Sequence, residues 1–143
     1  LRGVDAWERG LSEGIRALCE CHPGTIAETP AQAAALFDRL GRERFDVLVH
    51  PFSRPEGLSE WFQVLGPMVT HVHVQMRDED NLPIRLDRRP AFVRDTVRLM
   101  RDAGFRGSWT LEFTEGTNRP GENIDDLWAN ALLDLAFLRE ALA

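Results

Sequence analysis

The sequence has no apolar run close to the roughly 18 residues needed to cross a bilayer, and its N-terminus has no signal-peptide pattern. We therefore expect no membrane partner. The chain has only two cysteines, Cys19 and Cys21, and their spacing on a strand would place them too far apart for easy bridging. Free thiols are typical of a reducing compartment, so the cysteine content predicts a cytoplasmic protein.

The sequence has no excess of basic over acidic residues. The formal net charge is −6, and basic residues are mixed with acids, as in 85–89. Because a nucleic-acid surface normally needs a basic patch, we expect no nucleic-acid partner. The length of 143 residues is suited to one domain with a real core, which we predict over 1–143. The chain starts at Leu1 inside a helical pattern, without an initiator Met, which suggests a segment of a longer protein.

Apolar residues recur at helical spacing in five segments. The predicted helices lie at about 5–15, 30–41, 59–66, 90–104 and 124–142. Thr29 and the proline that follows it form a typical helix start. Trp7, Trp61 and Trp128 lie on the apolar faces of three of these helices, so we expect them in the core.

Four short apolar runs alternate with these helices. The predicted strands are 17–22, 46–50, 70–75 and 108–113. Strands that alternate with helices predict an α/β fold with a parallel sheet and right-handed crossovers. Four such units fit an open flavodoxin-like sheet, and they fit half of an eight-stranded TIM barrel equally well.

Polar residues with metal-binding or acid–base side chains follow each strand at its carboxyl end, the edge where parallel α/β folds bind ligands. They are Glu20, His22, His50, His71, His73, Gln75 and Glu112. Alternation turns Cys19 and Cys21 away from Glu20 and toward the helices, which argues against a cysteine metal cluster. Carboxylates and imidazoles together suit Mn, Co, Fe or Zn, and such a site could polarise a carbonyl while the glutamates move protons.

Four short motifs carry a family resemblance. They are L-C-E-C-H-P-G-T (18–25), V-L-V-H-P (47–51), T-H-V-H-V (70–74) and W-T-L-E-F (109–113). In order and spacing they resemble strands five to eight of the sugar phosphate isomerase/epimerase family, the xylose-isomerase-like TIM barrels. The resemblance covers essentially the whole chain. It implies the C-terminal half of a TIM-type (β/α) barrel, completed by a missing N-terminal half-barrel or by self-association.

The resemblance also implies an activity and a site. By position, the metal ligands would be Glu20, His50, His73 and Glu112, and the two glutamates would act as base and acid on opposite faces of the substrate. The implied substrate is a small sugar or polyol, deprotonated next to its carbonyl. One divalent metal would stabilise the resulting enediolate.

Two features depart from the family pattern. The family usually has Asp where this chain has His50, and an imidazole there favours Mn, Co, Zn or Fe over Mg and leaves open that no metal is bound. The position of a substrate-binding His is occupied by Ser53, and Arg77 is the nearest match to the substrate-binding Arg. The alternative is therefore a non-catalytic sugar-binding barrel with a degenerate metal site.

Further candidates lie on the strand ends and loops. We expect substrate contacts from His22, Arg54, Gln75 and Arg77, because all four lie at or beyond the strand ends that would form the site. His71 lies two residues deeper than His73 and is expected to be structural. The sequence does not identify the sugar.

Overall fold

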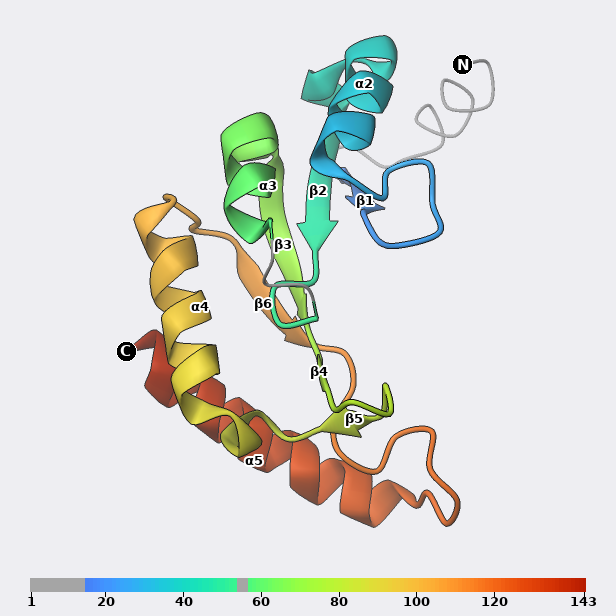
Figure 1. Cartoon of the computed structure of the whole chain (residues 1–143), viewed down its shortest axis with the longest axis vertical. Helices are drawn as coiled ribbons and strands as arrows, with labels where there is room; N and C mark the ends of the chain where they lie inside the picture. The colour runs from blue at the N-terminus through green and yellow to red at the C-terminus, as the bar shows by residue number, and fades with distance from the viewer. Residues whose placement is uncertain (1–14, 54–56) are drawn as a thin grey trace.

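The structure, a computed structural model, describes residues 15–53 and 57–143 and contains a four-stranded sheet. Its strands are β1 (Ala17–Glu20), β2 (Phe45–Val49), β3 (Val69–Val74) and β6 (Ser108–Leu111), in the order β1-β2-β3-β6. All neighbouring pairs are parallel, so the carboxyl ends of the strands meet at one edge (Figure 1). The predicted α/β class and parallel sheet are confirmed, and the described strands form an open sheet rather than a closed barrel.

A helix follows each of these strands, as the sequence predicts. The helices are α2 (Pro30–Leu40), α3 (Leu58–Leu65), α4 (Pro90–Asp102) and α5 (Ile124–Leu142). The start of α2 is fixed by a capping box, in which Thr29 accepts from the backbone N–H of Gln32 and Gln32 accepts from the backbone N–H of Thr29. The helix predicted near 5–15 lies mostly outside the described residues, and Trp7 lies wholly outside them.

Short elements fill the connections. Within residues 15–53 and 57–143 there are three 3₁₀ turns, η1 (Arg42–Arg44), η2 (Gly66–Met68) and η3 (Leu86–Arg88). After β3 the chain forms an antiparallel hairpin from β4 (Met76–Arg77) and β5 (Pro83–Ile84). The sequence did not predict this hairpin, because strands of two residues are too short to show alternation.

The core lies between one face of the sheet and the helices. The strands contribute Val47, Val49, Val72 and Val74, and the helices contribute Phe37, Leu65, Val93 and Met100. Cys21 is buried and Cys19 packs against the same cluster, so both thiols face the helices as predicted, and both are free. Trp61 also packs against this core.

The prediction that Trp128 lies in the core is wrong. Its side chain is 66% exposed, and Ile124 one turn earlier is 76% exposed. The helix α5 instead buries Asp134 and Leu138. Asp134 accepts hydrogen bonds from the backbone N–H of Leu86 at 2.8 Å and from Oγ1 of Thr114 at 2.6 Å. These bonds orient the Asp134 side of α5 toward η3, so the side with Trp128 faces outward.

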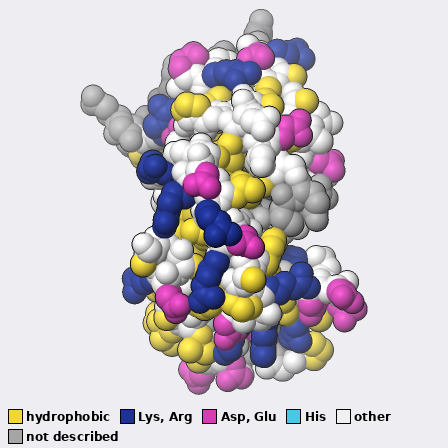
Figure 2. All heavy atoms as spheres, turned by 60° about the vertical axis from the view of Figure 1, so that its left-hand side comes forward, with side chains coloured by type: hydrophobic (Ala, Val, Ile, Leu, Met, Phe, Trp, Pro, Cys, Tyr) yellow, Lys and Arg dark blue, Asp and Glu magenta, His cyan; other side chains and the backbone are white. Residues whose placement is uncertain are grey.

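The second face of the sheet is open to solvent in the described chain. Leu18 on β1 is 47% exposed, and Ser108 and Thr110 on β6 are exposed. On the face in Figure 2, arginine and acidic side chains are interspersed, and apolar side chains gather toward the lower end, where Figure 1 places α5. Among the described helices, we find none with the length and apolar character needed to cross a membrane.

Candidate active site at the carboxyl edge of the sheet

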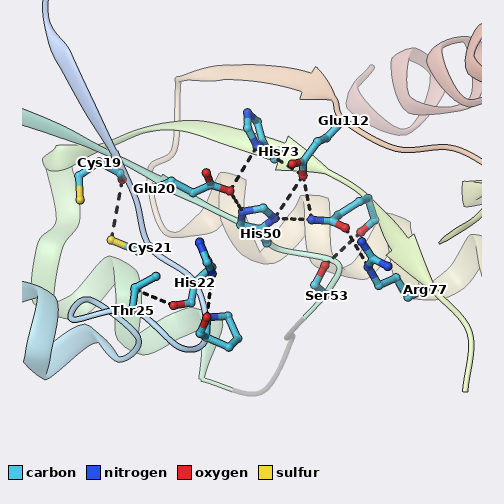
Figure 3. Close-up of polar contacts among 12 residues, drawn as sticks. Cys19, Glu20, Cys21, His22, Thr25, His50, Ser53, His73, Arg77 and Glu112 are labelled. Atoms are coloured by element: carbon cyan, nitrogen blue, oxygen red, sulfur yellow. Dashed lines mark hydrogen bonds and ion pairs between the residues drawn. The ribbon is translucent and has the colours of Figure 1, made fainter. Parts of the chain in front are cut away.

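Four ligand-type side chains meet where the parallel strands end (Figure 3). Glu20 is the last residue of β1, His50 follows β2, His73 lies near the end of β3, and Glu112 follows β6. The backbone N–H of Glu112 donates to the carbonyl of Val74 at 3.1 Å, which continues the pairing of β3 with β6 by one residue. The strand register therefore brings together the four residues expected at this edge.

His50 occupies the centre of the cluster. Its Nε2 lies 2.8 Å from Oε1 of Glu20, and its Nδ1 lies 3.6 Å from Oε2 of Glu112. Its ring centroid lies 5.4 Å from that of His73. The buried strand β2 ends just before His50, and Pro51 prevents the ladder from continuing. His50 thus contacts both carboxylates from one fixed position.

His73 faces the same two carboxylates. Its Nδ1 lies 3.4 Å from Oε2 of Glu112 and 3.8 Å from Oε1 of Glu20. This nitrogen is buried and makes no hydrogen bond within the described structure. A buried nitrogen without a partner is costly, so it indicates a position where a further group is expected.

The donor set fits a transition metal. Glu20, His50 and His73 each offer one ligand atom, and these atoms lie within 4.8 Å of one another. Oε2 of Glu112 adds a fourth donor next to His73. Mixed imidazole and carboxylate donors suit Zn, Fe, Co or Mn better than Mg.

Gln75 is a buried member of the cluster. Its Nε2 donates to Oε2 of Glu112 at 2.8 Å and lies 2.7 Å from Nδ1 of His50. Its Oε1 accepts from Nε of Arg77 at 2.9 Å. The sequence pattern placed Gln75 on the correct face, but no local signal could identify its contacts with Glu112 and Arg77, which depend on tertiary packing.

Arg77 lies beside the cluster, on the hairpin strand β4. A second guanidinium nitrogen donates to the carbonyl of Asn81 at 2.8 Å, and its guanidinium carbon lies 5.5 Å from the ring centroid of Phe113. These contacts fix the guanidinium against the hairpin and the ring. Arg54, predicted as another substrate contact, lies outside the described residues.

The remaining candidates lie at the margins. His22 is exposed beyond the end of β1, where its Nδ1 donates to the carbonyl of Pro23 at 2.8 Å, and it lines the cavity described below. His71 hydrogen-bonds Ser108 across the sheet, as expected of a structural residue. Burial and, to a smaller extent, the neighbouring His73 lower the pKa of His71.

A cavity of about 880 Å³ opens over the cluster, within the size range of small-molecule sites. Its polar lining includes Glu20, His50, Gln75, Arg77 and Glu112. Apolar walls come from Phe52, Leu58, Trp61 and Phe92. A few convergent polar groups inside an apolar wall can orient a small polar ligand.

Comparison with known proteins gives one informative match. No protein-family model matches the chain, and no curated protein matches it in sequence. A crystal structure of D-psicose 3-epimerase in the presence of D-fructose matches with a TM-score of 0.66 and 21% sequence identity. The match covers 90% of this chain and 50% of that one. The chain therefore shares its fold with about half the length of that epimerase chain. At this identity the likeness concerns the fold alone.

Proposed function

We propose that the chain is the C-terminal half of a TIM-type barrel that acts as a sugar isomerase or epimerase. The observation that carries this proposal is the placement of two carboxylates, Glu20 and Glu112, on the two outermost strands of the sheet. Both carboxylates and His50 line one cavity, and His73 lies behind them, with its Nδ1 within 3.8 Å of each carboxylate. Two carboxylates on opposite sides of a substrate can remove a proton next to a carbonyl and return one to the other face.

Each residue of the cluster would have a separate role in the reaction. Glu20 and Glu112 would take and return the proton at Oε2 and Oε1 respectively, because their other oxygens lie beside His73, where the metal would bind. Gln75 orients Glu112 by donating to its Oε2. A divalent metal held by Glu20, His50, His73 and Glu112 would polarise the substrate carbonyl and stabilise negative charge on its oxygen. The apolar walls around Trp61 and Phe92 would limit water near the reacting atoms.

The open surfaces of the described chain support the half-barrel part of the proposal. Within the described sheet, β1 and β6 each pair with one strand, and such edges are sites of association. Leu18 on the open sheet face and Trp128 on α5 expose large apolar area. The epimerase match spans about half of the solved chain. An N-terminal half-barrel, or a second copy, would cover these surfaces and close the barrel.

One observation favours the second candidate, a sugar-binding barrel without catalysis. Both ring nitrogens of His50 contact protein side chains, Nε2 with Glu20 and Nδ1 with Gln75. A ligand position that is already satisfied by hydrogen bonds has less need of a metal. In this alternative, the cavity binds a sugar without catalysing a reaction.

The test uses the full-length protein, with metal analysis and turnover of ketohexoses, D-psicose and D-fructose included, in deuterated water. We expect stoichiometric transition metal and incorporation of solvent deuterium next to the carbonyl. Glu112→Gln should lower turnover by about 100-fold or more, the contribution of a positioned acid or base. Glu115→Gln is the matched control, since Glu115 pairs with Arg88 at 3.1 Å outside this cluster.

Two results would reject the proposed enzymatic activity. One is the absence of stoichiometric metal together with a Glu112→Gln variant that turns over sugars as the unaltered protein does. The other is sugar binding by calorimetry with no deuterium incorporation in any ketohexose tested, which supports the binding protein instead.

A further inference from the structure

The orientation of the Gln75 side chain follows from its contact with Arg77. A guanidinium can only donate hydrogen bonds, so the Gln75 atom 2.9 Å from Nε of Arg77 must be the oxygen, Oε1. The amide NH₂ then points the other way. It lies 2.7 Å from Nδ1 of His50 and 2.8 Å from Oε2 of Glu112. Because Gln75 is buried, few other partners compete for these groups.

This orientation determines which nitrogen of His50 carries the proton. The ring nitrogen that faces an NH₂ donor must accept, so Nδ1 of neutral His50 is unprotonated and Nε2 carries the hydrogen. Nε2 lies 2.8 Å from Oε1 of Glu20, in position to donate to that carboxylate. Donors and acceptors therefore match along the whole chain of contacts from Arg77 to Glu20 (Figure 3).

The same proton affects metal binding. A metal binds the lone pair of an imidazole nitrogen, and a nitrogen that carries hydrogen offers none. The Nε2 atom of His50, which carries the proton, faces Oε1 of Glu20. The same oxygen of Glu20 also faces Nδ1 of His73. If the Gln75 amide flipped, so that its oxygen and nitrogen exchanged places, its oxygen would face Nδ1 of His50. The proton would then move to Nδ1, and Nε2 could bind a metal.

We propose that Arg77 is a positioning residue which, through the Gln75 amide, holds His50 as a hydrogen-bond donor to Glu20 and so weakens metal binding at this site. The proposal rests on the proposed function only in treating His50 as a potential ligand. It assigns to Arg77 and Gln75 the control of the His50 tautomer. The substitution of His for the usual Asp thereby makes ligation depend on a neighbouring amide.

The test is nitrogen NMR of the metal-free full-length protein with ¹⁵N-labelled histidine, at about pH 8, where an ordinary histidine is neutral. We expect the His50 signals of a ring protonated on Nε2. Arg77→Leu should raise the share of the Nδ1-protonated tautomer, because only the contact of Nε2 with Oε2 of Glu112 then orients the amide. Arg89→Leu removes the same charge from the same cavity lining and should leave His50 unchanged. Gln75→Glu places only acceptors beside Nδ1, so the proton should move to Nδ1.

Zinc binding by calorimetry is the second readout. Arg77→Leu should bind Zn²⁺ about tenfold or more tightly than Arg89→Leu, the scale at which outer partners alter metal sites. A wild-type His50 protonated on Nδ1 would overturn the proposal, as would identical His50 signals in the Arg77→Leu and Arg89→Leu proteins. If Arg77→Leu does not fold, the wild-type and Gln75→Glu spectra decide. None of these measurements involves a sugar, so an inactive protein with the expected tautomer rejects the proposed function alone.

Discussion

Oε1 of Glu20 lies 3.8 Å from Nδ1 of His73, although their strands, β1 and β3, are separated by β2. Neighbouring strands are about 4.8 Å apart, so strands one position further apart are separated by about twice that distance. The two side chains must therefore lean toward each other over the end of β2. His50 stands at that end, and its Nε2 contacts the same Glu20 oxygen at 2.8 Å. A single carboxylate oxygen thus faces two imidazoles.

This shared oxygen predicts that Glu20 is central to metal binding. Glu20→Gln should lower the affinity of the full-length protein for Zn²⁺ or Mn²⁺ by about tenfold or more, since it replaces a charged ligand by a neutral one. Calorimetric titration of the metal-free protein measures the change. Glu28→Gln is the control, because Glu28 lines the same cavity but is not among the clustered ligands. Equal affinities in the two variants would contradict the assignment.

The buried carboxyl of Asp134 predicts a pH-dependent stability. Burial raises the pKa of Asp134 above its usual value, and hydrogen bonds from Thr114 and from the backbone of Leu86 oppose the shift. A carboxyl with a raised pKa in the folded state stabilises the protein below its unfolded pKa. That contribution is lost as the pH rises through the folded pKa. Asp134→Asn removes this titration, so its stability relative to wild type should increase as the pH rises above the ordinary pKa of Asp, about 4.

Urea denaturation of the two full-length proteins at several pH values measures this difference. Asp134→Leu is the comparison, because it leaves the N–H of Leu86 and the hydroxyl of Thr114 without their acceptor. We expect it to lose about 2 kcal/mol or more of unfolding free energy. A constant difference between Asp134→Asn and wild type across the pH range would refute the role given to burial.

The capping box at α2 predicts a local stability effect. Thr29→Ala removes the acceptor for the backbone N–H of Gln32 and should cost about 1 kcal/mol of unfolding free energy. Thr29→Ser keeps a hydroxyl at the cap and should recover most of that loss. Denaturant unfolding of the full-length protein compares the three. An Ala variant as stable as the Ser variant would show that the hydroxyl does not stabilise the helix.

The exposed face of α5 predicts that a partner half covers it. Trp128→Ala should destabilise the full-length protein by about 3 kcal/mol if Trp128 is buried against the rest of a barrel. A truly exposed Trp128 would change stability by about 0.5 kcal/mol or less, which is the result that argues against a covered face.

The 143-residue chain alone should associate. A monodisperse monomer by light scattering would contradict both a missing half and a paired copy.

Much of the fold could be predicted from local patterns. The period of apolar residues, Thr29 at a helix start and Pro51 at a strand end gave helices and strands close to those observed. The apolar face of α5 could not be read this way. Asp134 is buried there while Trp128 is exposed, because tertiary hydrogen bonds from Leu86 and Thr114 orient the helix. Periodicity carries no information about such contacts.

The candidate site, like the fold, could be predicted only in part from the sequence. Alternation along strands placed Glu20, His50, His73 and Glu112 at one edge, since the ends of parallel strands meet there. The contacts of Gln75 with His50 and Arg77 depend on side-chain conformations and on a short hairpin. No sequence period encodes these, so the sequence predicts a substrate contact for Gln75 but not its contacts within the cluster.

All four ligand-type residues of the site lie between Glu20 and Glu112 of one continuous polypeptide segment. In a barrel completed by another half, the reacting groups would be inherited as one block, while the loops of the other half could vary independently. Under the proposed function, exchange of that other half between related barrels should then change which sugar is accepted and leave the proton-transfer groups in place. The two halves would be separable units of evolution and of protein engineering.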